Sequence, residues 1–129
     1  MRNFVEEDLA HIWHPAMQMK DMEVFPPIPI DHAKGVYLYG TDGKAYLDII
    51  SSWWCNLLGH GNEEINEAIT AQLSKVEHII FTNFTHQPAL DLVHHLLPHL
   101  PEGLRRFTFH DNGSSAVEAA LKLAFQYQY

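Results

Sequence analysis

The segment at residues 111–118, DNGSSAVE, most constrains what this chain can fold into. Before it, residues 105–110 alternate polar and aromatic side chains with the two-residue period of a β-strand. After it, apolar residues recur at the three- and four-residue intervals of a helix lying on a sheet: Val117, Ala120, Leu121, Ala124 and Phe125. We therefore expect a strand, a tight glycine turn and a helix start in immediate succession, as in an α/β protein.

The turn itself is suited to binding an anion such as phosphate. Gly113 lets the backbone approach a ligand closely, and Ser114 and Ser115 offer hydroxyl groups. Ser115 and Glu118 have the spacing of a capping box, which predicts that the helix begins there. Free N–H groups and the positive end of the helix dipole then point at one place. These residues alone leave two interpretations open, a phosphate site or an ordinary strand-to-helix turn with a capping serine.

Composition and charge exclude several classes of partner. The 129 residues, 47% hydrophobic and 19% charged, suit one small globular domain. The net charge is −8 and the eight Lys and Arg residues are scattered, so we expect no nucleic-acid and no membrane partner. The single cysteine, Cys55, and the lack of an apolar signal segment favour a soluble protein of the cytoplasm.

The other expected elements fit the same α/β fold class. A β-hairpin with an Asp-Gly turn is expected over residues 36–49. Helices are expected over 63–78 and 88–97, whereas the proline-rich stretch 25–30 should be extended. The last helical pattern runs to the final residue with no stop signal, so we expect the chain to end inside an element of an incomplete domain.

Ten histidines raise the question of a metal site, which the sequence does not favour. His95 and His99 have the four-residue spacing of helical ligands, but Pro98 interrupts that helix and no acidic or thiolate ligand stands at a supporting interval. His60, between two glycines, is expected in a loop near a site rather than as a ligand. Cys55 lacks a recognisable base, so no nucleophile and no acid–base set can be assembled.

Two adjacent tryptophans, Trp53 and Trp54, stand in a serine- and glycine-containing stretch. In an extended segment they would alternate faces, so that one enters a core and the other faces a cavity. The alternative is that both are partly buried core residues, which is the commoner situation for large aromatic side chains. Residue patterns alone leave both interpretations open.

Five segments carry a resemblance to a known family. In chain order they are HIWHP at 11–15, QMK at 18–20, SSWW at 51–54, FTHQPA at 84–89 and DNGSSAVEAALK at 111–122. Together they resemble the class III aminotransferases, which are fold-type I pyridoxal-phosphate enzymes. The glycine–serine turn and its helix are common to the class, whereas HIWHP and SSWW resemble the branch that acts in biotin biosynthesis. The resemblance runs from about His11 to the last residue.

The resemblance implies a cofactor, substrates and an assembly. Gly113 and Ser114 match the positions that hold the phosphate of pyridoxal 5′-phosphate, and Trp53 matches a tryptophan that lines the substrate pocket. The implied reaction moves an amino group from S-adenosyl-L-methionine to 7-keto-8-aminopelargonate (8-amino-7-oxononanoate), in a homodimer. Residues 1–62 would be the N-terminal segment and β-hairpin of the small domain, and 63–129 the start of the large cofactor-binding domain.

One residue departs from the family pattern, and the family's catalytic lysine has no match. Many relatives carry a tyrosine where this chain has Ala16, which makes the implied substrates less firmly supported than the cofactor. The family's Schiff-base lysine and ring-nitrogen carboxylate lie downstream of Tyr129, and Lys122 is poorly placed on its helix. No catalytic residue is therefore assigned, and we expect the 129-residue chain to be inactive alone. Another class III ω-aminotransferase and a non-catalytic truncated remnant stay open as alternatives.

Overall fold

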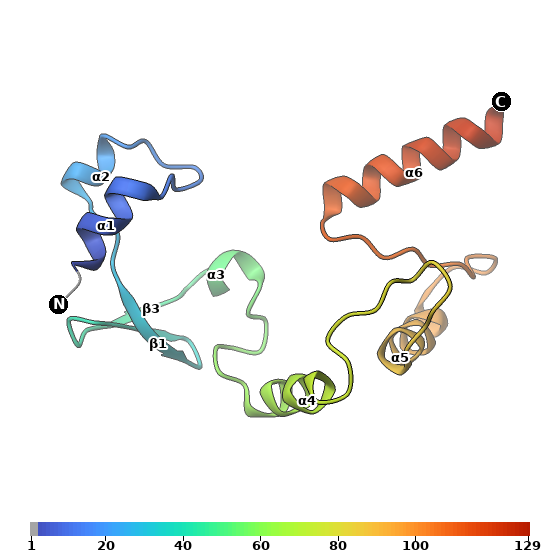
Figure 1. Cartoon of the computed structure of the whole chain (residues 1–129), viewed down its shortest axis with the longest axis horizontal. Coiled ribbons are helices and arrows are strands. Elements are labelled where there is room, and N and C mark those ends of the chain that lie inside the picture. Colours follow the sequence, from blue (N-terminus) through green and yellow to red (C-terminus); the bar gives the residue numbers. More distant parts are fainter. Residues whose placement is uncertain (1–2) are drawn as a thin grey trace. The chain divides into compact units, whose positions relative to one another are not determined.

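A computed structural model describes residues 3–129 and divides into two compact units (Figure 1). The first unit ends at Glu77 and the second runs from His78 to Tyr129. The first holds a small antiparallel sheet with four helices, and the second holds two α-helices and a 3₁₀ turn.

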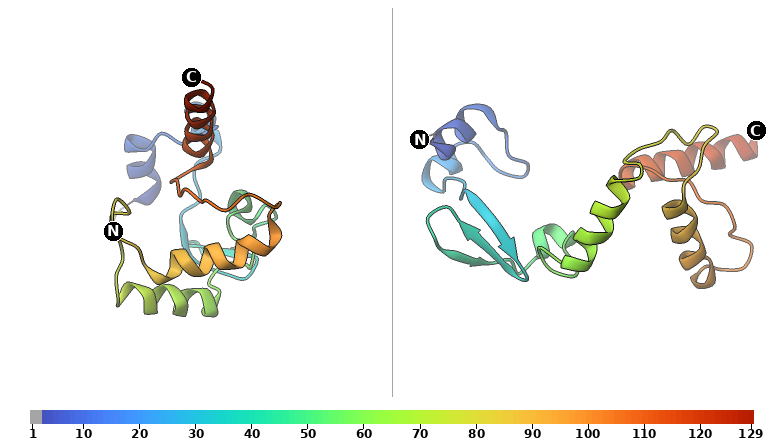
Figure 2. Two further views of the ribbon diagram at one scale, coloured as in Figure 1. Left: turned by 90° about the vertical axis from the view of Figure 1, so that its right-hand side faces the viewer. Right: turned by 60° about the horizontal axis from the view of Figure 1, so that its bottom comes forward.

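A three-stranded antiparallel sheet organises the first unit, with strand order β1-β2-β3 (Figure 2). The strands are β1 (Ile30–Lys34), β2 (Tyr37–Gly40) and β3 (Ala45–Leu47). Gly43 adopts φ +79°, which the tight turn between β2 and β3 requires and glycine supplies without strain. The predicted hairpin is thus confirmed. Strand β1 was not predicted, because its polar sequence IDHAK carries no alternation of apolar residues.

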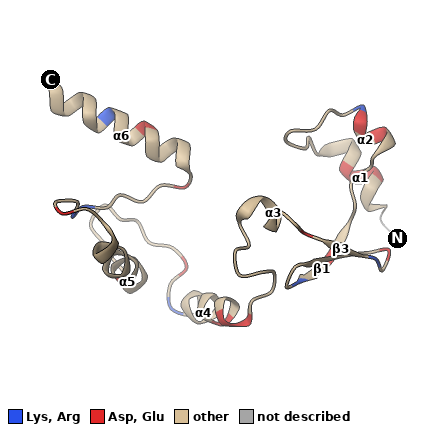
Figure 3. Cartoon of the chain, turned by 180° about the vertical axis from the view of Figure 1, so that it is seen from behind, with Lys and Arg blue, Asp and Glu red and all other residues tan. Residues whose placement is uncertain are grey.

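Four helices complete the first unit: α1 (Phe4–His11), α2 (Asp21–Val24), α3 (Ser51–Trp54) and α4 (Glu63–Leu73). The Asn62 side chain caps α4 by accepting a hydrogen bond from the Ile65 N–H at 3.0 Å. The acidic start of α4, red in Figure 3, suits the positive end of the helix dipole.

Helix α4 is shorter than the predicted 63–78. Its end is closed at Ser74, whose N–H bonds the Thr70 carbonyl at 3.2 Å. The next N–H, of Lys75, bonds only three residues back to Gln72 at 2.9 Å, which is the tightened geometry of a terminal 3₁₀ turn. The Val76 N–H bonds the same Gln72 carbonyl at 3.0 Å, so the chain closes in a final turn after Leu73 although the apolar periodicity continues to Val76.

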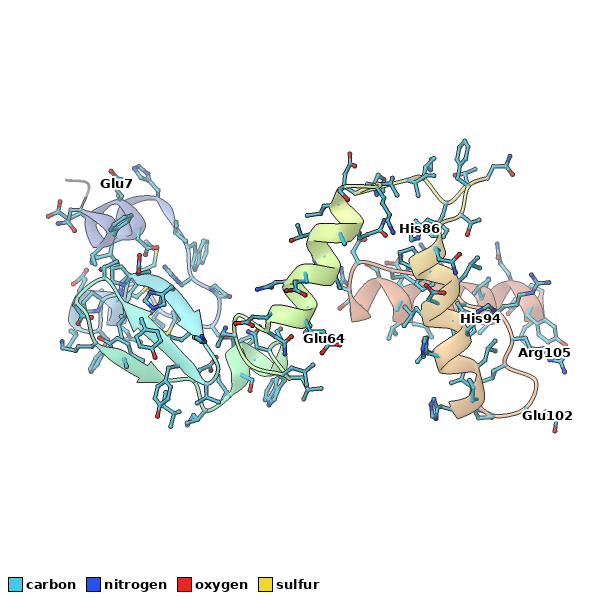
Figure 4. The ribbon with its side chains drawn as sticks, turned by 90° about the horizontal axis from the view of Figure 1, so that it is seen from below. Glu7, Glu64, His86, His94, Glu102 and Arg105 are labelled. Carbon is cyan, nitrogen blue, oxygen red and sulfur yellow. The ribbon has the colours of Figure 1, made fainter. Side chains whose placement is uncertain are left out.

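Both helices predicted in the second unit are present. They are α5 (Gln87–Leu96), followed by the 3₁₀ turn η1 (Leu97–His99), and α6 (Gly113–Gln128). His86, labelled at the start of α5 in Figure 4, accepts a hydrogen bond from the Ala89 N–H at 3.3 Å and so caps that helix. As expected, α5 starts around Pro88 and ends before Pro98.

The strand predicted over residues 105–110 is not formed, and that prediction is wrong for this structure. Residues 104–110 have no regular secondary structure. A strand exists only by exchanging backbone hydrogen bonds with a neighbour, and no described residue provides such a neighbour here. The segment does contact residue 81, since the rings of Phe81 and Phe109 lie 5.9 Å apart.

The described residues bury very little apolar surface. Only Met22, 4% exposed, and Ala89, 9% exposed, count as buried hydrophobic residues. The predicted apolar stripe of α6 is present but uncovered, with Val117, Leu121 and Phe125 all exposed. No described helix is both long enough and apolar enough to cross a bilayer. The uncovered stripe is an amphipathic face without a packing partner among the described residues.

Candidate functional site

The start of helix α6 is fixed by Asn112. The Asn112 side-chain oxygen accepts a hydrogen bond from the Ser115 N–H at 2.9 Å, and its carbonyl accepts one from the Ala116 N–H at 3.2 Å. The predicted capping box is therefore wrong, since the helix begins at Gly113 and Glu118 instead pairs with Lys122 at 2.6 Å. An asparagine directly before the first helical residue reaches the third amide of the helix, and so takes the role expected of the serine.

This cap leaves two donors available at the end of the helix. Within the described part of the chain, no hydrogen bond uses the N–H groups of Gly113 and Ser114. A β-carbon added to Gly113 would meet nothing within 4 Å, so the approach to these amides is open. The dipole of a 16-residue helix adds partial positive charge at the same place. Two amides, the Ser114 hydroxyl and the dipole together fit a phosphate group.

The two tryptophans lie on a left-handed turn, which neither interpretation of the sequence anticipated. Ser51, Ser52, Trp53 and Trp54 have φ of 48°, 48°, 61° and 64°. Each non-glycine residue in this region costs about 1–2 kcal/mol. Trp53 is 61% exposed and Trp54 79% exposed, so the core interpretation is wrong for this structure. The turn presents both indoles outward.

A carboxylate, Asp48, holds this turn. Its Oδ1 accepts a hydrogen bond from the Ser52 N–H at 2.9 Å, and its Oδ2 accepts one from the Ser52 hydroxyl at 2.7 Å. The same Oδ2 accepts a third hydrogen bond from His60 Nε2 at 2.7 Å. The side chains of Asp48 and His60 are only 5% and 14% exposed. The Ser52 N–H, then His60 and the Ser52 hydroxyl, lower the pKa of Asp48 to about 2.

His60 was predicted as a loop residue, and its role as a partner of Asp48 was missed. Its backbone N–H and carbonyl exchange hydrogen bonds with Gly35 at 2.8 and 2.9 Å, in an isolated bridge beside the sheet. The partners are twelve residues apart and follow no local spacing rule. The sequence signals that could have pointed to them are an acidic residue directly after a strand and a histidine flanked by two glycines.

The other histidines and the cysteine show no metal site. His95 Nδ1 lies 2.7 Å from the Asp91 carbonyl, one turn earlier on α5, and His99 lies in η1. Cys55 is exposed, with its thiol 3.6 Å from the Trp53 carbonyl. Over residues 3–129, no three His, Cys, Asp or Glu side chains gather as metal ligands would.

Acid is expected to release the tryptophan turn. The folded pKa of Asp48, about 2, lies below its ordinary value of 3.8, so the stabilisation is complete above pH 3.8 and is lost as the pH falls through about 2. The near-ultraviolet circular dichroism of the indoles, followed from neutral pH downward, should change in that window. The Asp48→Asn variant should lack this step, and Asp42→Asn, an exposed carboxylate in the neighbouring hairpin turn, should retain it. A step that persists in Asp48→Asn would contradict the assignment.

The predicted binding residues fall in both units. Gly113 and Ser114 lie together at the start of α6 in the second unit, as predicted. Trp53 lies on α3 in the first unit. Ala16 also has positive φ, 59°, and lines a shallow hollow formed by residues 13–18.

Comparison with known proteins gives a consistent result. Residues 17–129 match the model of the class-III aminotransferase family. The adenosylmethionine-8-amino-7-oxononanoate aminotransferase of Helicobacter pylori is 42% identical over 125 residues, which are 95% of this chain and 28% of that protein. The enzyme of the same name from Nitratidesulfovibrio vulgaris is 47% identical over 120 residues, which are 93% of this chain and 22% of that protein.

A solved structure agrees with these sequence relatives. The adenosylmethionine-8-amino-7-oxononanoate aminotransferase of Methanocaldococcus jannaschii superposes with a TM-score of 0.87 at 38% identity, over 95% of this chain and 28% of that one. The chain thus spans about a quarter of the length of the relatives it matches. It belongs to the class III aminotransferases, a pyridoxal-phosphate-dependent family with an α/β fold.

Proposed function

We propose that this chain supplies part of the cofactor and substrate sites of an aminotransferase that moves an amino group from adenosylmethionine to 8-amino-7-oxononanoate. The names of the relatives at 42% and 47% identity support this reaction. The single observation that carries the proposal is the open, asparagine-capped start of α6, where two unused amides and a hydroxyl converge. That arrangement fits the phosphate of pyridoxal 5′-phosphate.

Gly113 and Ser114 are the proposed phosphate ligands. Their N–H groups and the Ser114 hydroxyl donate to phosphate oxygens, and the α6 dipole favours the negative charge. When bound, the cofactor supplies an electron-withdrawing ring that stabilises negative charge on the substrate carbon. The task of these residues is to hold one end of the cofactor so that its reactive end has a fixed direction.

Trp53 is the proposed wall of the substrate pocket. Its indole is exposed on a turn whose backbone is held by a carboxylate with a side chain only 5% exposed, so a flat apolar face is presented in a set direction. Such a face suits the hydrocarbon chain of 8-amino-7-oxononanoate. The polar ends of both substrates would then be recognised by other groups.

The wider assembly is part of the same proposal. Residues 1–62 are assigned to the N-terminal segment and β-hairpin of the small domain, and 63–129 to the start of the large domain. The active protein is a homodimer in the cytoplasm, acting on small molecules and not on nucleic acid or membranes. Lys122 is not the Schiff-base lysine, because it is exposed on α6 and paired with Glu118. The proposal assigns no Schiff-base lysine to these 129 residues, and the chain alone is expected to be inactive.

A second candidate is a class III ω-aminotransferase with another amino acceptor. The feature that favours it is Ala16, which stands where the family resemblance implies a substrate-contacting tyrosine and where the backbone has φ 59°. A smaller side chain there leaves room for a differently shaped acceptor.

Product analysis separates the two candidates. The protein as its own cell makes it is purified with pyridoxal phosphate and given 8-amino-7-oxononanoate with adenosylmethionine or with alanine. The proposal expects 7,8-diaminopelargonate by mass spectrometry, formed at least about tenfold faster with adenosylmethionine. Amination only of another acceptor, such as a simple ketone supplied in place of 8-amino-7-oxononanoate, would support the second candidate. Formation of 7,8-diaminopelargonate only from alanine would contradict adenosylmethionine as the donor. No amino transfer in any combination would reject both.

A further inference from the structure

We propose that Asp48 is a positioning residue for the substrate wall: its carboxylate holds the left-handed turn that presents Trp53, and His60 anchors that carboxylate to the sheet. The inference rests on the proposed function, because it gives Trp53 its purpose. It adds a specific device, made of one carboxylate, one histidine and one serine, that sets where the indole lies.

The turn needs support from outside because its own residues disfavour its left-handed backbone conformation. Four successive non-glycine residues with positive φ form the turn, although side chains at such positions meet the following carbonyl groups. Backbone hydrogen bonds contribute, from the Trp54 N–H to the Ile50 carbonyl at 2.8 Å and from the Asn56 N–H to the Ser51 carbonyl at 3.1 Å. Strain of this kind persists only where the surroundings impose it, and it clusters at ligand sites.

Asp48 supplies the constraint from outside the turn. Its carboxylate accepts two hydrogen bonds from Ser52, one from the backbone N–H and one from the hydroxyl. These two bonds fix both the position and the rotation of that residue. Ser52 directly precedes Trp53, so its orientation sets the direction of the next side chain. Hydrogen bonds to an ionised acceptor are about twice as strong as neutral ones, which suits a strained segment.

The turn that joins β1 to β2 supplies the fixed end, since Gly35 and Val36 lie between these strands. The Asp48 N–H bonds the Val36 carbonyl at 2.9 Å, and the His60 backbone is paired on both sides with Gly35. A β-carbon on Gly59 would lie 3.0 Å from the Gly35 carbonyl oxygen, so the loop that carries His60 approaches the sheet as closely as a glycine allows. Asp48 is therefore held at its own backbone and, through His60, at its carboxylate.

A carboxylate that only positions the wall has a distinctive kinetic signature. It touches no reacting atom, so its loss should weaken acceptor binding and leave the chemical step nearly unchanged. We expect Asp48→Asn to raise the KM for 8-amino-7-oxononanoate about tenfold, with kcat within about twofold of wild type. The matched control is Asp42→Asn, which removes a carboxylate from the hairpin turn that has no contact with Ser52 or His60.

A second readout is independent of activity. The near-ultraviolet circular dichroism of the indoles should weaken in Asp48→Asn and stay unchanged in Asp42→Asn, both measured in the protein as its cell makes it. Replacing Ser52 by glycine in the Asp48→Asn background should recover part of the KM, because glycine adopts positive φ without strain. If Asp48→Asn does not fold, Ser52→Ala removes only the hydroxyl bond and should change both readouts in the same direction by a smaller amount.

The possible results separate this inference from the proposed function. If the wild type aminates no acceptor, the function is rejected, and the dichroism of Asp48→Asn against Asp42→Asn still decides the positioning role. Unchanged dichroism and unchanged KM in Asp48→Asn would overturn that role. A fall in kcat with KM unchanged would also overturn it, since that pattern belongs to a group acting in the chemical step.

Discussion

Replacing Ser114 by aspartate is expected to weaken the binding of pyridoxal phosphate by about 100-fold or more, because like charges placed together cost several kcal/mol. The same substitution should stabilise α6 by about 0.5 kcal/mol, since a carboxylate at a helix N-terminus interacts well with the dipole. The two effects have opposite signs. A lower affinity therefore could not be explained by damage to the helix.

The control for this variant is a change of ligand. Pyridoxal lacks the phosphate, so its affinity for the Ser114→Asp protein should equal its affinity for the wild type. Both dissociation constants are measured by absorbance titration of the protein from which cofactor has been removed. An equal loss of affinity for both ligands would mean that the substitution had disturbed the rest of the cofactor site. Unchanged affinity for pyridoxal phosphate would mean that its phosphate binds elsewhere.

Replacing Trp53 by alanine is expected to produce the second large effect, a loss of affinity for the amino acceptor. Burying a large apolar side chain against a ligand is worth about 1.5–3 kcal/mol. We therefore expect the KM for the amino acceptor to rise about 10- to 100-fold. Trp53→Phe should keep part of the binding, because it retains a flat aromatic face.

Trp54→Ala is the matched control for Trp53, since the two side chains are neighbours on the same left-handed turn and both are exposed. Steady-state kinetics on the three variants should show a large change of KM in Trp53→Ala alone. Equal changes in Trp53→Ala and Trp54→Ala would indicate that the whole turn had moved. An effect confined to Trp54→Ala would assign the substrate wall to the other indole.

Sequence patterns were sufficient where a structure depends on near neighbours along the chain. The apolar stripe of α6, the prolines around α5 and the Asp-Gly turn of the hairpin each act within a few residues, and each was predicted. The placement of Gly113 and Ser114 at the start of α6 was predicted for the same reason, since the helix they begin positions them, and their binding of phosphate stays a prediction. The capping residue was misidentified, since Asn112 and Ser115 are both competent caps and only geometry separates them.

The features that the sequence did not predict depend on contacts between residues that are distant along the chain. Asp48 and His60 meet across twelve residues, and the left-handed turn they support contradicts the local preferences of serine and tryptophan. Residues 105–110 have the alternation of a strand but no neighbour with which to pair among the described residues. The uncovered face of α6 accords with a chain that spans about a quarter of the length of its relatives.

The most direct test of the central claim, that the start of α6 holds the cofactor phosphate, is the phosphorus magnetic resonance of bound pyridoxal phosphate as a function of pH. A free phosphate monoester loses its second proton at a pKa of about 6. Two amides, a hydroxyl and a helix dipole favour the dianion, so the bound resonance should stay at the dianion position well below that pH. A bound resonance that titrates at about pH 6, as in free cofactor, would contradict the account.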